Sequence, residues 1–364
     1  MRKVLQTWID RYFGDEEPVL LAVLLILGLF IILTMGVTLA PVITAVIIAF
    51  LMQGVVGRMV RMGIPHLLAV LIATLLLVGF LVAAFLMILP IMWQQAVTLL
   101  SALPGMLTEW KQLLMLLPAR YPTLIQPEQI ESVIALAGNE LGNLGQVVLS
   151  SSLESLPLLF HTLIYLIIVP ILVFFFLKDS RTILTWIGGF LPHHRPTMGV
   201  IWAEMNVQAA NYVRGKFIEI IIVGVVSFIT FVWLDLNYAL LLAVAVGLSV
   251  IIPYIGATVV TLPVAMIGLF QWGIGPEFTW LMIAYISIQV LDGNVLVPLL
   301  FSEAVSLHPV AIIVAVLVFG SFWGLWGAFF AIPLATLVKA ILVSWPTRYA
   351  LAEGHNDGSD QAAR

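Results

Sequence analysis

The sequence contains no cysteine and very few charged residues. Only 9% of its 364 residues are Asp, Glu, Lys or Arg, whereas a typical soluble domain has about 25%. The absence of cysteine excludes disulfides, thiolate metal sites and cysteine nucleophiles. With 62% hydrophobic residues, the chain has too little polar surface for a water-soluble fold, and that class is excluded too.

Motifs of nucleotide binding and catalysis are also missing. The sequence has no Gly-x-x-x-x-Gly-Lys-Ser/Thr phosphate loop, no Gly-x-Ser-x-Gly elbow and no His-Glu-x-x-His metal motif. A net charge of −4 without a basic block excludes a nucleic-acid partner. The adjacent His193 and His194 lack helical spacing and nearby carboxylates, so they do not indicate a metal site. We expect no enzyme, no cofactor and no metal.

Long apolar runs recur along almost the whole chain. A helix needs about 20 apolar residues to cross a hydrocarbon core of roughly 30 Å. These runs are continuously apolar, which favours helices over the alternating strands of a barrel. We predict an all-α, polytopic integral membrane protein with about eight transmembrane segments, some of them broken or re-entrant. The predicted segments are residues 19–36, 38–56, 65–92, 157–177, 214–234, 239–272, 278–300 and 307–338.

The distribution of Lys and Arg predicts the orientation in the membrane. Basic residues precede the first segment, occupy the turn at Arg58 and Arg61, and recur in the middle loop, so these regions should be cytoplasmic. We expect both termini to face the cytoplasm, in a bacterial inner membrane. The predicted regions are N-terminal transmembrane segments (1–92), an external, periplasmic segment of amphipathic helices (93–156), a C-terminal transport core (157–348) with a cytoplasmic loop near 178–213, and a disordered cytoplasmic tail (349–364).

Two of the predicted segments have unusual lengths. As one straight helix, residues 239–272 would measure about 51 Å at 1.5 Å per residue, too long for one upright span and too short for two. Pro253 and Gly256 near its middle indicate a break. Residues 307–338 are interrupted in the same way by proline and glycine. Each is either a kinked single span or a re-entrant hairpin, and transporters use such broken segments to expose backbone groups near the midplane.

Asp292 is a carboxylate deep inside an apolar segment. Placing it there costs about 2.5–3.5 kcal/mol, so such an acid usually faces a bundle interior or a wet cavity. It could bind a proton, a cation or a substrate, or it could only make an interhelical hydrogen bond or an oligomer contact. The candidate residues of a transport path are Asp292, Gln289, Asn294, Gly293, Pro253 and Gly256.

Five other polar residues are secondary candidates. Glu219 follows Lys216 by three residues, which favours a local ion pair at the cytoplasmic membrane edge. Glu303 fits a turn or a hairpin entry. His308 precedes a proline and could titrate near neutral pH, although an isolated histidine is more often a structural hydrogen-bonding residue. Arg214 lies in a polar stretch that predicts a helix leading into the membrane.

Several motifs resemble those of the autoinducer-2 exporter (AI-2E) family of permeases, particularly its PerM-type members. The similarity is strongest from Leu156 onward, and the family pattern usually has Glu where this chain has Asp292. The motifs that carry the resemblance are Phe174–Asp179, Tyr212–Lys216, Pro253–Ala257, Gln289–Pro298, Leu307–Pro309 and Gly324–Pro333.

The resemblance implies a helical permease that forms homo-oligomers. Some members of the family are described as exporters of the signalling molecule autoinducer-2 and others as sodium/proton antiporters. We therefore expect a secondary transporter or facilitator that exports a small polar solute of the autoinducer-2 type. One alternative is a cation/proton antiporter that uses Asp292, and another is a non-transporting oligomeric scaffold that recruits envelope proteins. The expected partners are the lipid bilayer and a small polar solute or monovalent cation.

Overall fold

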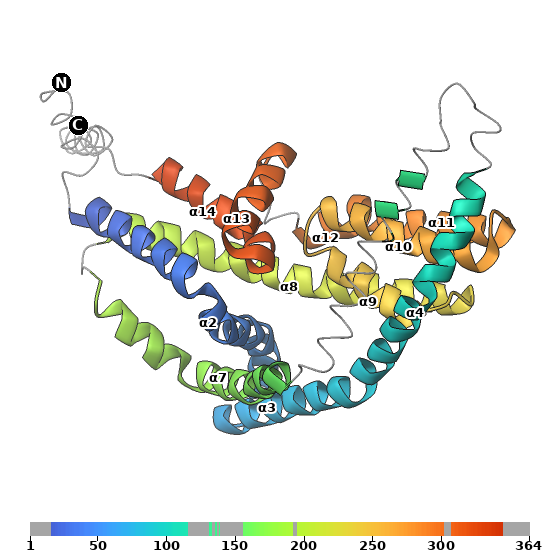
Figure 1. The fold of residues 1–364 in the computed structure, drawn as a ribbon. Coiled ribbons are helices and arrows are strands. Elements are labelled where there is room, and N and C mark those ends of the chain that lie inside the picture. Colours follow the sequence, from blue (N-terminus) through green and yellow to red (C-terminus); the bar gives the residue numbers. More distant parts are fainter. Residues whose placement is uncertain are drawn as a thin grey trace, which may run out of the picture.

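The computed structural model describes residues 16–115, 131–132, 135–136, 138, 156–191, 195–301 and 307–344. Among these residues every regular element is helical, and none is a strand (Figure 1). In chain order the elements are α2 (Glu16–Arg61), α3 (His66–Ala83), the π-helical turn η1 (Ala84–Ile88), α4 (Leu89–Leu114), α7 (Leu156–Gly188), α8 (Pro196–Trp233), α9 (Ala239–Ser249), α10 (Ile255–Trp272), α11 (Pro276–Leu291), the π-helical turn η2 (Asp292–Leu296), α12 (Val297–Phe301), α13 (Pro309–Phe329) and α14 (Ala331–Ser344).

Six helical stretches of the described chain are long and apolar enough to cross a membrane. They are Thr38–Arg61, His66–Met106, Pro196–Trp233, Ile255–Trp272, Pro276–Phe301 and Pro309–Phe329. Shorter apolar helices cover Val19–Ile31, Ala239–Ser249 and Ala331–Val343. The prediction of an all-α, polytopic membrane protein is confirmed.

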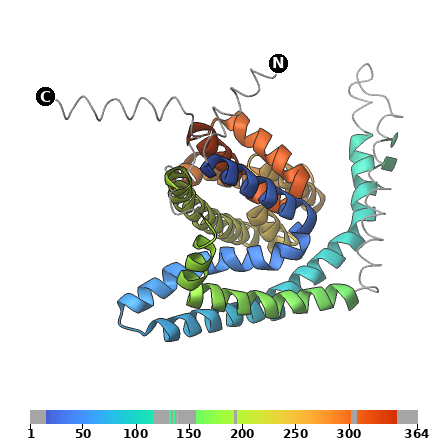
Figure 2. The same cartoon turned by 90° about the vertical axis from the view of Figure 1, so that its left-hand side faces the viewer.

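The first two predicted segments, 19–36 and 38–56, are not separated by a loop but lie in one continuous helix, in which Val19–Ile31 and Thr38–Arg61 are distinct apolar stretches. Both lie in α2, which has 46 residues. The predicted boundary follows Gly36 and carries no charge, and because a single glycine is tolerated within a helix, the chain stays helical there. Pro41 lies inside this helix and removes one of its hydrogen bonds. Figure 2 shows that α2 bends part-way along its length.

The region near 178–213, predicted as a cytoplasmic loop, is helical over most of its length. α7 continues to Gly188 and is kinked at Asp179, where φ is −108° and ψ is 15°. α8 then begins at Pro196 and runs without a break to Trp233. The segment 93–156 starts within α4, but most of it lies outside the described residues, as does the tail 349–364. The amphipathic helices and the disordered tail stay predictions.

Residues 239–272 form an antiparallel helical hairpin, α9–α10. At its open end the side chain of Gln271 accepts a hydrogen bond from the Asn237 amide (2.8 Å) and donates one to the Asp235 carbonyl (2.7 Å). At its tip Gly256 lies so close to the Ser249 carbonyl that a Cβ would overlap with it. The two ends of the segment are therefore side by side, and residues 250–254 form the tip.

Residues 309–344 form a second hairpin, and its tip lies inside α13. Trp323 (φ −137°) and Gly324 (φ +58°) interrupt the helical backbone. Beyond this break the chain returns against itself, because Gly327 lies against the Phe319 carbonyl without room for a Cβ. Only glycine adopts the Gly324 conformation easily and allows the Gly327 approach, which explains why glycines occur at this reversal.

α8 is the helix that connects the parts of the fold. It packs against α2, α9, α11, α12 and α14, and in Figure 1 it extends along the middle of the molecule beneath α13 and α14. Its N-terminus is held by Glu17, whose carboxylate accepts a hydrogen bond from the Met198 amide (2.7 Å). Both hairpins thus contact one continuous helix.

The α9–α10 hairpin predicts that its two ends lie on the same face of the membrane. Because the chain has no cysteine, the single variants Asn237→Cys and Ile274→Cys report these ends directly, and both positions are exposed. We expect a membrane-impermeant maleimide to label both from the same side of sealed vesicles. Arg58→Cys provides a reference for the predicted cytoplasmic side. Labelling of positions 237 and 274 from opposite sides would instead require a single span.

Candidate functional site

A cavity of about 670 Å³ lies where α8 meets the tips and ends of the other helices. Its walls come from α8, from the tip of the α9–α10 hairpin, from α11 to α12, and from α13 and α14. The polar residues that line it are Tyr212, Lys216, Glu219, Tyr254, Thr258, Gln289 and Asp292. Most of the remaining lining residues are apolar, so polar groups are concentrated in an otherwise hydrophobic chamber.

Among the described residues, Lys216 is the one cation that lines this cavity, and it is almost fully buried. Its Nζ lies 2.8 Å from Glu219 Oε2, and only 4% and 2% of these side chains are exposed. The ammonium also donates a hydrogen bond to the Val250 carbonyl (2.7 Å) and lies 5.4 Å from the centre of the Phe301 ring. The predicted ion pair is confirmed, but it lies in the protein interior and not at an exposed membrane edge.

The buried position of this pair follows from the helix break at the first hairpin. The last residues of α9 turn away at Val250, which leaves its carbonyl without a helical donor. Lys216 supplies that donor from α8. Sequence spacing predicts the contact with Glu219 on the same helix, but the partner at Val250 depends on tertiary structure.

Tyr212 connects α8 to the second hairpin. Its hydroxyl donates to the Phe329 carbonyl (2.8 Å), and its ring packs against Phe301 and Phe329 at centroid distances of 5.7 and 5.9 Å. Between Tyr212 and Lys216, Gly215 faces Phe301 so closely that a Cβ would overlap with the ring. The Tyr212–Lys216 stretch therefore contacts both hairpins and α12.

Asp292 and Gln289 face the cavity from the α11–η2 junction. α11 ends at Leu291, and the π-helical turn η2 begins at Asp292. π-Helical turns are rare in proteins, and those that occur are often found at functional sites. Asp292 Oδ1 and Gln289 Nε2 are buried, and neither forms a hydrogen bond of good geometry in the described structure, although Gln289 interacts with the nearby Tyr285 hydroxyl. Buried polar groups are almost always paired, so two such groups at one cavity indicate a place for a bound molecule or ion.

The charges around the cavity do not balance. Lys216 interacts electrostatically with Glu219 and Asp292, and the two carboxylates repel each other. Within the part of the chain that the structure describes, one ammonium therefore faces two carboxylates. Burying an uncompensated charge is expensive, so the site favours an additional proton or cation, or a donor group of a solute.

The other predicted site residues divide into three groups. Pro253 and Gly293 line the cavity, and Gly256 forms the close contact of the hairpin tip behind it. Asn294 is exposed, and its amide is bonded to the Val290 carbonyl (2.9 Å), so it does not join Asp292 at the cavity. Asn294 follows Asp292 by two residues, so on a helix the two side chains point to different faces.

Two secondary candidates, His308 and Arg214, do not line the cavity either. His308 is exposed and caps α13, where its Nδ1 accepts a hydrogen bond from the Val310 amide (3.3 Å). Arg214 lines a different cavity on the other side of α8. Glu303 lies outside the described residues.

Sequence reasoning missed Tyr212, Tyr254 and Thr258 as lining residues. Tyr254 adopts a left-handed backbone conformation (φ +63°), which is rare for a residue with a side chain and is often found at functional sites. Its position between Pro253 and Gly256 could have indicated a lining residue, because a helix break exposes the side chains at its tip. Among the described residues, no group of three or more His, Asp or Glu side chains could hold a metal ion.

Comparison with known proteins identifies the family. The model of the AI-2E family of transporters matches residues 20–347. This chain belongs to the AI-2E transporter family. It is 44% identical to "Putative permease PerM" of Escherichia coli (strain K12) over 346 residues, which cover 95% of this chain and 98% of that protein. It is 28% identical to "Putative transport protein YueF" of Bacillus subtilis (strain 168), covering 84% and 83% of the two chains.

Membership in this family, together with the apolar helices, makes the protein a multi-pass membrane transport protein. The resemblance seen in its motifs is thereby confirmed. The motif Tyr212–Lys216 and the Gln289–Pro298 stretch both contribute to the cavity described above. Two of the motifs that carry the resemblance thus lie at one cavity of this AI-2E transporter.

The buried pair predicts a specific pattern of stability. Glu219→Ala leaves the Lys216 ammonium without its carboxylate and should destabilise the protein by about 3–5 kcal/mol. Lys216→Met combined with Glu219→Leu removes both charges and should be closer to the original protein in stability. Thermal unfolding of the detergent-solubilised chain, followed by tryptophan fluorescence, compares the variants. A double variant as unstable as Glu219→Ala would show that the charge pairing is not what matters.

Proposed function

We propose that this protein is a secondary transporter or facilitator that carries a small polar solute through the cavity between α8, the hairpin tips and η2. The observation that supports it most is the pair of buried groups without a hydrogen bond of good geometry, Asp292 Oδ1 and Gln289 Nε2, on one wall of this cavity. An ionisable residue within a membrane segment is costly and usually serves a transport path. In this proposal the protein is not an enzyme.

The broken helices support the same function. Transporters place substrate sites where interrupted helices present backbone groups and helix ends to a cavity. Here residues 250–254 and the start of α13 both line the chamber, together with the polar side chains of α8. The site is therefore built from elements that can change their packing without unfolding a full membrane span.

The cavity fits a small hydrophilic solute of the autoinducer-2 type. Its volume of about 670 Å³ lies in the range of small-molecule sites. The carboxylate of Asp292 accepts hydrogen bonds and the amide of Gln289 donates them, which suits a compact solute with several hydroxyl groups. Export is our proposed direction, and the predicted inner-membrane location, cytoplasmic termini and homo-oligomer belong to the same proposal.

Asp292→Asn should abolish transport, because it removes the negative charge at the cavity wall and keeps the size of the side chain. Asp292→Glu restores a carboxylate and should retain part of the activity. The matched control is Asn294→Ala, two residues away, whose side chain does not line the cavity. Uptake of autoinducer-2 into everted membrane vesicles measures all three variants. Unchanged uptake by a well-expressed Asp292→Asn protein contradicts the role.

A cation/proton antiporter is the second candidate, and the excess negative charge at the cavity favours it. In proteoliposomes an antiporter should exchange sodium or potassium ions for protons, and the exchange should disappear with Asp292→Asn. Solute uptake without obligatory cation exchange would instead support the exporter. A protein that moves neither solute nor ions, while its 93–156 segment binds an envelope protein, would be a scaffold.

A further inference from the structure

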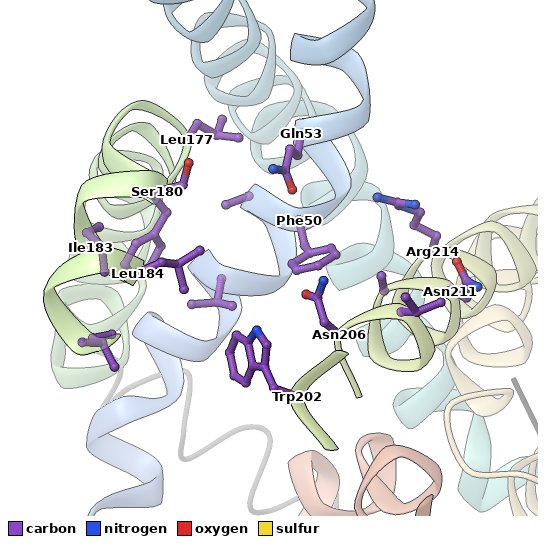
Figure 3. A pocket seen from close by; sticks show the side chains of 16 residues that line it. Phe50, Gln53, Leu177, Ser180, Ile183, Leu184, Trp202, Asn206, Asn211 and Arg214 are labelled. Atoms are coloured by element: carbon purple, nitrogen blue, oxygen red, sulfur yellow. The ribbon is translucent and has the colours of Figure 1, made fainter. Parts of the chain in front are cut away.

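A second cavity lies on the other side of α8 from the proposed transport site. It has a volume of about 800 Å³ and is enclosed by α2, α7 and α8 (Figure 3). Its lining residues are Val46, Ala49, Phe50, Gln53, Phe176, Leu177, Ser180, Ile183, Leu184, Ile187, Trp202, Asn206, Val207, Ala210, Asn211 and Arg214. We call it the α2–α7–α8 groove.

The groove exists because α7 is kinked. Before the kink, Leu177 packs in the same core as Ala49 of α2. The non-helical backbone of Asp179 then changes the direction of the helix, so the residues from Ser180 onward form one wall of the opening. Trp202 and Leu184 remain 64% and 54% exposed there, so the described protein itself does not fill the groove.

The lining separates into an apolar part and a polar part. Eleven of the 16 lining residues are apolar, four are uncharged and polar, and one is Arg214. Figure 3 shows Gln53, Asn206 and Arg214 around Phe50, with Leu177, Ile183 and Leu184 on the α7 side of the opening. The groove is thus amphipathic, with an apolar wall beside a cluster of hydrogen-bonding groups.

Arg214 gives the polar part an uncompensated positive charge. No Asp or Glu lines the groove, and within the described residues Arg214 forms no ion pair. Its guanidinium lies 5.9 Å from the centre of the Phe50 ring, which holds it by a cation–π contact and leaves its N–H donors free. A guanidinium with free donors binds phosphate in a bidentate manner, and side-chain amides of Gln53 and Asn206 can add hydrogen bonds.

We propose that the α2–α7–α8 groove binds one anionic glycerophospholipid, with its phosphate at Arg214 and an acyl chain along the apolar wall of α7, which places the helical residues 180–188 and 196–207 against the cytoplasmic leaflet and not free in the cytoplasm. A water-soluble anion would leave the apolar wall uncovered, and a zwitterionic lipid would place a second cation beside Arg214. The bilayer supplies anionic lipid at high local concentration, and basic pockets between membrane helices are known to hold such headgroups. The proposed site is separate from the transport cavity.

Trp202 in the groove provides the readout. The full-length protein is reconstituted into nanodiscs that contain a small fraction of phosphatidylglycerol or phosphatidylcholine with brominated acyl chains, which quench nearby indoles. The quenching of Trp202 is obtained as the difference in fluorescence quenching between the original protein and the Trp202→Phe variant. We expect phosphatidylglycerol to quench it at about tenfold lower lipid fraction, because both lipids offer a phosphate to Arg214 but phosphatidylcholine also places its choline cation beside the guanidinium.

Arg214→Gln should remove that preference, whereas Arg181→Gln, which removes a charge from α7 outside the groove, should keep it. Equal quenching by both lipids in the original protein overturns the proposal, because the groove would then hold ordinary bilayer lipid. The absence of quenching, together with disulfide-linked dimers of a Val207→Cys variant, also overturns it and shows that a second copy fills the groove. The comparison of phosphatidylglycerol with phosphatidylcholine is made on the original protein. It therefore tests the proposal even if an Arg214 variant does not fold.

Discussion

A lysine ammonium inside an apolar helical bundle must be neutralised and hydrogen-bonded where it lies, because desolvating it otherwise costs several kcal/mol. Lys216 meets this requirement with a carboxylate on its own helix, a carbonyl from the first hairpin and the ring of Phe301 from α12. These partners come from three separate elements. The arrangement of α8, the hairpin tip and α12 is therefore coupled to one buried charge.

The two hairpins supply the backbone carbonyl groups that α8 binds around this charge. A continuous helix would satisfy its own carbonyls and offer none to Lys216, but the break after α9 releases the Val250 carbonyl. The reversal at Gly324 brings Phe329 back to accept the hydroxyl of Tyr212. Both breaks thus create backbone acceptors inside the bundle, and α8 supplies the donors. The proposed transport cavity is the space left between these contacts.

α8 separates two chambers of different chemistry. Successive residues of an α-helix differ by about 100°, so positions two apart point to nearly opposite sides. Lys216 faces the proposed transport cavity, while Arg214 faces the α2–α7–α8 groove. The same short motif therefore serves an interior site with excess negative charge and an amphipathic groove with a free positive charge, and any movement of α8 would affect both.

The sequence alone determined the membrane class and the positions of the two helix breaks, and it singled out Asp292 as a candidate residue, because hydropathy, proline, glycine and the cost of a buried acid are local properties. It also predicted the Lys216–Glu219 pair from spacing along one helix. Only the tertiary structure decided that both broken segments are hairpins, that the pair is buried beside Val250, and that Asn294 faces away while Tyr212 joins the site. These features depend on which elements pack together, and a helical pattern specifies a face without specifying its neighbour.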